Sequence, residues 1–96
     1  MKTLVRKIPK IEVIEVIEVE NEGFNSLLGE TITLFCAVYI YTGKLVGVSS
    51  TYVKLETPKI VYETGAFDQK NWKDAQALPN DIYIQLSMVE AFGIVK

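Results

Sequence analysis

The feature that most limits how this chain can fold is a succession of short, strand-like segments between residues 31 and 63. The segments are rich in β-branched and aromatic residues, which suit a pleated, half-buried surface. Gly43 and the Ser49–Ser50 pair are expected to mark turns, and Pro58 is expected to interrupt the strand ladder. Strands are therefore predicted over residues 31–41, 44–49, 51–56 and 60–63. Turn signals spaced about ten residues apart predict a meander that bends or closes.

Both ends of this central run continue the pattern. Toward the C-terminus, Ile82, Ile84 and Leu86 alternate with more polar residues, and residues 92–95 are predicted to form a last strand. On the other side, residues 24–28 are predicted to form one helical turn that Gly29 ends. The expected fold class is mainly β: a small five- to six-stranded bent sheet or barrel with one or two short helical turns.

Residues 11–20 form a three-residue repeat of Ile, Glu and Val, which predicts an extra N-terminal strand because every residue other than glutamate is β-branched. Strand alternation would place apolar residues on both faces, so a second chain or a second sheet would have to cover them. The alternative is a helix that gathers Glu12, Glu15, Glu18 and Glu22 on one side. The preceding residues 1–10 are expected to be a solvated basic tail carrying Lys2, Arg6, Lys7 and Lys10.

The 96 residues are expected to form a single domain. Its parts would be the basic tail 1–10, the extra strand 11–20 and a barrel core over residues 24–95. Within the core, residues 64–81 form the most polar long connection, where one short helix is predicted with Asn71 as its N-cap and Asp74 in its first turn. A long loop in a compact domain is often functional.

The central pattern resembles the first motif of the Sm-like family of small, SH3-like β-barrels. The matching parts are Ser26-Leu27-Leu28-Gly29, residues 32–40, Thr42-Gly43-Lys44-Leu45-Val46-Gly47-Val48 and Tyr52-Val53-Lys54-Leu55, while residues 82–94 could stand for the second motif. The chain is also similar to uncharacterised small phage and bacterial proteins that have Tyr-Thr-Gly followed by Leu-Glu. The resemblance implies a five-stranded, strongly bent sheet that forms rings through its edge strands, with a ligand surface in loops. The RNA-binding residues of the family are not recognisable here, because no Asp-x-x-Asn occurs between Ser49 and Val53.

Several classes of chemistry are excluded by what the chain lacks. It has no histidine, so the commonest general base and the commonest neutral metal ligand are missing. With one cysteine as well, neither a Ser-His or Cys-His nucleophile nor an ordinary zinc site can be built. Asp68, Asp74 and Asp81 share one loop, but their spacing alone does not indicate that they converge. We therefore expect no enzyme, no metal and no cofactor; the alternative is an enzyme that uses only carboxylates.

Two short segments are predicted to contact a ligand. Tyr41, Thr42 and Lys44 form one of them, and Asn71, Trp72 and Lys73 form the other. Each combines a ring, hydrogen-bonding groups and a lysine near a predicted turn, which is the chemistry needed to stack on a base and meet a phosphate. The alternatives are that the tyrosines simply pack on half-buried strands and that Trp72 covers the open end of a barrel.

The predicted function is that of a non-enzymatic, homo-oligomeric binding module for a nucleotide-like or short single-stranded nucleic-acid ligand. A phage-encoded protein of this kind could sequester a signalling nucleotide. The alternative is a self-assembling or protein-binding module that uses residues 11–20 for pairing between subunits. The net charge of −2 argues against an extended phosphate-binding surface. The lone Cys36 lies in an apolar run, and neither a membrane span nor a secretory signal is recognisable, so a cytoplasmic protein without a membrane partner is expected.

Overall fold

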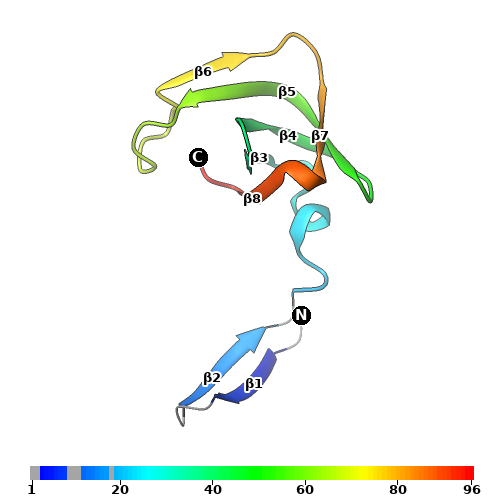
Figure 1. The fold of residues 1–96 in the computed structure, drawn as a ribbon, viewed down its shortest axis with the longest axis vertical. Helices are drawn as coiled ribbons and strands as arrows, with labels where there is room; N and C mark the ends of the chain where they lie inside the picture. Colours follow the sequence, from blue (N-terminus) through cyan, green and yellow to red (C-terminus); the bar gives the residue numbers. More distant parts are fainter. Residues whose placement is uncertain (1–2, 9–11, 18) are drawn as a thin grey trace.

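The computed structural model describes residues 3–8, 12–17 and 19–96, and it describes side chains from residue 19 onward. Its elements are β1 (Thr3–Ile8), β2 (Glu12–Ile17), the 3-10 turn η1 (Gly23–Leu27), β3 (Thr31–Cys36), β4 (Ile40–Val48), β5 (Tyr52–Glu63), β6 (Asp74–Ala77), β7 (Ile82–Gln85), the 3-10 turn η2 (Leu86–Met88) and β8 (Val89–Gly93). The predictions of a mainly β fold and of short helical turns are confirmed. The strands form two separate sheets, a hairpin and a larger bent sheet (Figure 1).

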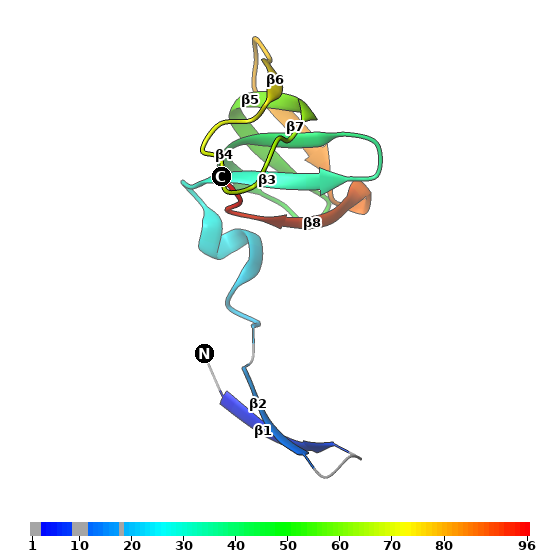
Figure 2. The same cartoon turned by 90° about the vertical axis from the view of Figure 1, so that its left-hand side faces the viewer.

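The larger sheet has six antiparallel strands and bends strongly around its inner face (Figure 2). The strand order is β6-β5-β4-β3-β8, and β7 also pairs with β5. The long β5 strand thus has β4 on one side, while β7 and β6 share its other side at opposite ends. The sheet is not closed into a barrel, because β7 and β8 pair with β5 and β3 but not with each other. Of the two predicted forms, the bent sheet is therefore the one that the structure has.

The core lies on the concave face of this sheet and is built by period-two alternation. Ile32 and Leu34 on β3, Leu45 on β4, and Val53 and Leu55 on β5 are at most 1% exposed. Ile84 of β7 completes the buried cluster. Because residues two apart on a strand share a face, each of these strands contributes apolar side chains to the concave face, while Thr33, between Ile32 and Leu34, is also buried at 2% exposed.

Gly43 does not mark a turn; it lies inside β4, opposite a bulge in β5. Thr42 pairs with Lys59 and Lys44 pairs with Glu56, so two residues of β5, Thr57 and Pro58, lie opposite the single Gly43. Pro58 does interrupt the ladder here, as predicted.

The chain reverses earlier instead, between β3 and β4. There the Cys36 backbone N–H donates to the Tyr39 carbonyl at 3.1 Å, and the Ala37 N–H donates to the Met88 carbonyl at 2.9 Å. The predicted strand over 31–41 is therefore wrong at residues 37–39.

At the N-terminal side of the sheet, the predicted helical turn is confirmed as η1. Gly29 follows it with a φ of 88°, a left-handed conformation that glycine adopts without a steric penalty. The ring of Phe24 stacks on Phe92 of β8, with centroids 3.7 Å apart. This contact fixes η1 against an edge of the sheet.

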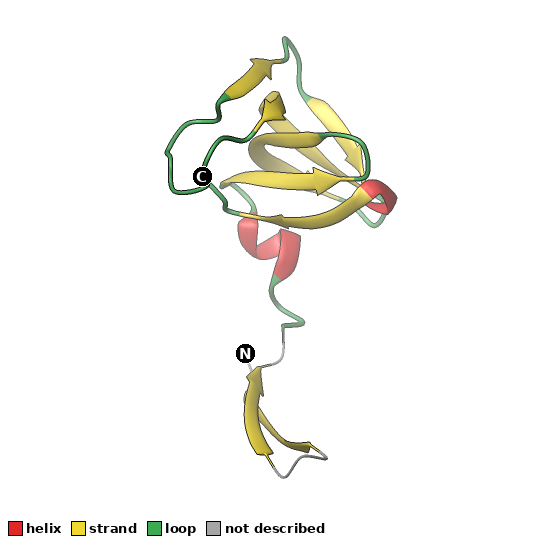
Figure 3. Cartoon of the chain, turned by 60° about the vertical axis from the view of Figure 1, so that its left-hand side comes forward, coloured by secondary structure: helices red, strands yellow, loops and turns green. Residues whose placement is uncertain are grey.

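The N-terminal hairpin stands clear of the larger sheet in all three views (Figure 3). The strand predicted over residues 11–20 is present as β2, and the helical alternative is wrong. Residues 11 and 18 lie outside the described residues, and residues 19 and 20 are not in a strand. Residues 1–10 were expected to be a solvated tail, but Thr3–Ile8 form β1, which pairs antiparallel with β2 from Thr3↔Ile17 to Ile8↔Glu12.

The helix predicted within residues 64–81 is wrong, because Asp74–Ala77 form strand β6. The C-terminal part of β5 pairs with β4 along one side only. β6 pairs with its other side through Lys59↔Ala77, Ile60↔Gln76 and Val61↔Ala75. Hydrogen bonds to a neighbouring strand satisfy backbone groups that a single short helical turn would leave open at its ends. Asn71 precedes this strand in a loop and caps no helix.

Candidate functional site

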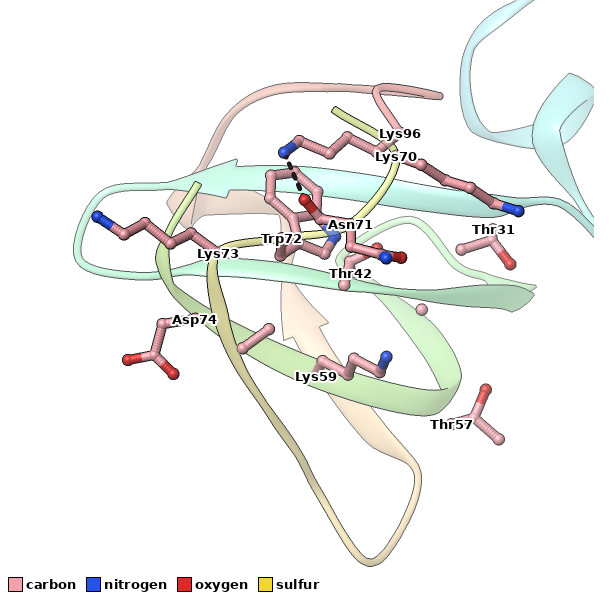
Figure 4. Close-up of a pocket in the computed structure, with 12 residues that line it drawn as sticks. Thr31, Thr42, Thr57, Lys59, Lys70, Asn71, Trp72, Lys73, Asp74 and Lys96 are labelled. Carbon is pink, nitrogen blue, oxygen red and sulfur yellow. Dashed lines mark hydrogen bonds between the residues drawn. The ribbon is translucent and has the colours of Figure 1, made fainter. Parts of the chain in front are cut away.

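A polar cleft of about 560 Å³ lies between the bulged region of β4 and β5 and the loop over residues 64–73 (Figure 4). Twelve residues line it: Thr31, Thr42, Gly43, Thr57, Lys59, Lys70, Asn71, Trp72, Lys73, Asp74, Ala75 and Lys96. The volume falls within the range of about 300–1,000 Å³ that is usual for small-molecule sites. We refer to this feature as the cleft.

Four of the six residues predicted to contact a ligand come together at the cleft. Thr42, Asn71, Trp72 and Lys73 line it although 29 positions separate Thr42 from Asn71. Tyr41 and Lys44 do not line it. The structure thus unites the two segments but separates Tyr41 from Thr42, because neighbouring residues on a strand point to opposite faces.

The floor of the cleft is the part of β4 and β5 around Gly43. The Thr42 side chain is 6% exposed, and its hydroxyl donates to the Ile32 carbonyl at 2.9 Å. A Cβ on Gly43 would lie 3.2 Å from each of three atoms of β5, so glycine allows this close approach without displacing them. Thr57 at the rim has a φ of 48°, which is strained for a β-branched residue. The bulge thus fixes a tightly packed floor.

The opposite wall is the loop over residues 64–73, which the Lys96 side chain holds from inside. The Lys96 Nζ donates to the carbonyls of Thr64, Ala66 and Asn71 at 2.6, 3.0 and 3.1 Å. It also lies 4.6 Å from the ring centroid of Trp72. All three N–H groups of the ammonium are therefore used within the protein.

The charges at the cleft are predominantly positive. Lys73 forms an ion pair with Glu63 at 3.2 Å, and in Figure 4 Lys73 and Asp74 point away from Lys59 and Lys70. Lys59 and Lys70 form no ion pair with any residue of the range 19–96, in which the structure describes side chains. These two ammonium groups lie on the same side of the cleft as Thr31 and Asn71. That side offers charged and neutral hydrogen-bond donors to an anion.

Tyr41 belongs to a different surface, a shallow groove that it lines with Cys36, Val38, Tyr39, Tyr83, Ile84, Gln85 and Met88. The rings of Tyr39 and Tyr41 meet edge to face, with centroids 6.2 Å apart. Burial, followed by the nearby Cys36, Tyr39 and Tyr62, raises the pKa of the Tyr41 phenol above its ordinary value. Tyr41 thus stays neutral at physiological pH and suits packing, which was the alternative considered for the tyrosines.

Comparison with family models, with curated proteins and with solved structures finds no match to this chain. The candidate site therefore rests on its own geometry. Among the described residues, no three or more cysteine, aspartate and glutamate side chains gather as a metal site would require. Within the same residues, no helix has the length and apolar character needed to cross a membrane.

Sequence reasoning did not single out Thr31, Thr57, Lys59, Lys70 or Lys96 as ligand-contact residues, although all five line the cleft. Thr57 could have been suspected, because it precedes the ladder-breaking Pro58 and bulges often lie beside functional sites. Nothing local marks Lys96, whose acceptors lie 25 to 32 positions away. Its role depends on the tertiary fold alone.

Proposed function

We propose that this protein is a non-enzymatic binding module that holds a small anionic, ring-containing ligand of the nucleotide class in the cleft. The observation that carries the proposal is that Lys59 and Lys70 line the cleft together with Asn71 and Trp72 and have no carboxylate partner among the side chains of residues 19–96. Lysine donors suit phosphate oxygens, and an aromatic ring suits the face of a base.

The shape of the cleft favours a mononucleotide or dinucleotide over a long strand. A volume of about 560 Å³ accommodates a ligand of nucleotide size. A long single strand would need a basic groove that follows its backbone, whereas the net charge of this chain is −2. We therefore favour the nucleotide among the two ligand classes that the sequence suggests.

The strand order supports the Sm-like, SH3-like resemblance as part of this proposal. β3, β4, β5, β7 and β8 make a strongly bent five-stranded meander with the 3-10 turn η2 before the last strand. β6 is an addition to that meander, and it carries the chain back from the loop that walls the cleft. The cleft would thus be a feature added to a common scaffold.

The test is a titration with AMP, GMP, ATP and inorganic phosphate. Binding is measured by calorimetry and by the fluorescence emission of Trp72, the single tryptophan. We expect saturable binding of at least one nucleotide. The Lys70→Met variant should weaken that binding about tenfold, as the loss of one charged hydrogen bond does. The Lys44→Met variant is the matched control, because Lys44 is exposed but does not line the cleft.

Two results would contradict the proposal. The first is the absence of any saturable nucleotide binding by the wild-type protein. The second is an equal loss of affinity in Lys44→Met and Lys70→Met, which would indicate nonspecific attraction by surface charge.

A second candidate function is self-assembly through the β1–β2 hairpin. The observation that favours it is a two-stranded sheet that stands apart from the six-stranded one (Figure 1). An isolated hairpin is at best marginally stable in water, and both of its strands are edges open to further pairing. Basic residues are concentrated in β1 and glutamates in β2, which suits pairing between copies.

Native mass spectrometry tests this assembly. Removal of residues 1–18 should lower the subunit number, and so should Ile14→Pro, which deletes a donor opposite Arg6 in the ladder. An unchanged subunit number in both variants would exclude the hairpin as the assembly element.

A further inference from the structure

The Lys96 side chain is an unusual component of the cleft because it points into the protein's own loop. Its Nζ atom lies within 3.1 Å of three carbonyl oxygens, those of Thr64, Ala66 and Asn71. The C-terminal end of the chain lies beside this loop in Figure 1 and inside its curve in Figure 3. One ammonium group thus replaces the regular backbone pairing that the loop lacks.

The contacts of Lys96 extend to the rings that shape the wall. Its Nζ lies 4.6 Å from the centroid of Trp72 and 5.7 Å from that of Phe67. The two rings meet edge to face at 6.4 Å, and Phe67 reaches Phe35 of β3 at 6.5 Å. The ammonium therefore connects the loop, its aromatic pair and the sheet below.

The loop has few other hydrogen bonds to hold it. Within it, the Gln69 N–H donates to the Ala66 carbonyl at 3.1 Å, and the Lys73 N–H donates to the Thr64 carbonyl at 3.4 Å. Both of these carbonyls also accept from Lys96. Loss of the ammonium would remove the strongest partner from each, since hydrogen bonds to charged groups are worth about twice those between neutral groups.

We propose that Lys96 is the positioning residue of the cleft: its ammonium orders the loop over residues 64–73 and so holds Asn71 and Trp72 in place for the ligand. Lys96 itself has no N–H group left for a ligand. This inference rests on the proposed function for its effect on binding, whereas the ordering of the loop is independent of any ligand.

The experiment compares Lys96→Met with Lys70→Met and with the wild-type protein. Without ligand, the emission of Trp72 and the exchange rates of the Gln69 and Lys73 amide protons report the loop directly. In Lys96→Met, we expect a shifted emission maximum and amide exchange about tenfold faster at both positions, while amides of the core strands exchange as before. In Lys70→Met, emission and exchange should both match the wild type.

With AMP, GMP or ATP as the probe, both variants should bind about tenfold more weakly than the wild type. Lys96→Arg, which keeps the charge, should lie between Lys96→Met and the wild type in emission and in affinity. Fast exchange of the core amides would identify a variant that has unfolded. If Lys96→Met unfolds, Lys96→Arg is compared with the wild type in its place.

Unchanged emission and unchanged exchange of Gln69 and Lys73 in Lys96→Met would overturn the inference. So would an altered loop with unaltered nucleotide affinity, since the ordering would then be irrelevant to binding. If no nucleotide binds the wild type but the loop loosens as described, the proposed function fails while the ordering role of Lys96 stands.

Discussion

Adding one methyl group at Gly43 tests the packing beneath the cleft. A Cβ there would lie 3.2 Å from the Glu56 carbonyl oxygen, the Leu55 Cβ and the Pro58 Cα. Carbon atoms in good contact are about 3.5–4.0 Å apart, so the Leu55 Cβ and the Pro58 Cα would have to move by a few tenths of an ångström. Two of the three atoms belong to the backbone of β5, and Leu55 is 0% exposed, so relief is restricted.

Two opposing terms determine the stability of Gly43→Ala. Overpacking a closed site costs about 1–3 kcal/mol. Replacing glycine by alanine also reduces the freedom of the unfolded chain, which stabilises by about 0.4–1 kcal/mol. The packing term is larger, so we expect the free energy of unfolding to fall by about 1–2 kcal/mol and the Tm to fall by about 5–15 °C.

Gly47→Ala is the matched control. Gly47 lies on the same strand at a second register shift, but a Cβ there would contact only the Lys54 Cβ, at 3.3 Å. Its free energy of unfolding should stay within about 0.5 kcal/mol of the wild-type value. Urea and thermal unfolding followed by circular dichroism measure both variants. If Gly43→Ala is as stable as Gly47→Ala, the floor of the cleft is not closely packed and the reasoning is refuted.

Three further predictions concern single side chains. Leu45→Ala should lower the free energy of unfolding by about 2–5 kcal/mol, because the side chain is 0% exposed in the core; a loss below 1 kcal/mol in urea unfolding would contradict this. Thr42→Val should cost about 1 kcal/mol through the lost 2.9 Å hydrogen bond to Ile32, with Thr42→Ser, which keeps the hydroxyl, as the comparison. Burial first and Glu90 second raise the pKa of the Cys36 thiol, so less thiolate is present at a given pH. Iodoacetamide should therefore alkylate Cys36 slowly at pH 8 and faster as the pH rises. Glu90→Gln should accelerate this alkylation only partly, because burial is the larger cause.

The strand content of the fold could be predicted from the sequence because β-branched and aromatic residues favour the extended conformation of their own segment. The positions of the breaks could not. Glycine in a strand pattern is compatible with a turn or with the close approach of another strand. At Gly43 the chain stays in a strand, and the bulge of β5 approaches it closely. The real reversal, at residues 37–39, contains Val38 and Tyr39, which carry no turn signal.

The segment that became β6 shows the same limit from the other direction. Residues 74–77 read Asp-Ala-Gln-Ala, and alanine and glutamine favour helix over strand. The unpaired side of β5 at residues 59–63 supplies a ladder for this segment, and that demand outweighs a weak local preference. The N-terminal repeat was a strand as predicted, yet its partner β1 lay within a segment whose four basic residues suggested a tail.

The candidate site divides along the same line between local and long-range causes. Asn71, Trp72 and Lys73 could be chosen because ring, amide and lysine are adjacent in a polar loop. Which lysines remain for a ligand could not be chosen, since that depends on where their partners lie. Four lysines line the cleft, and the fold uses two of them itself, Lys73 with Glu63 and Lys96 with the loop carbonyls. The composition of a loop thus predicts where ligand-binding side chains occur in the sequence. Which of them are available to a ligand depends on contacts between residues up to 32 positions apart.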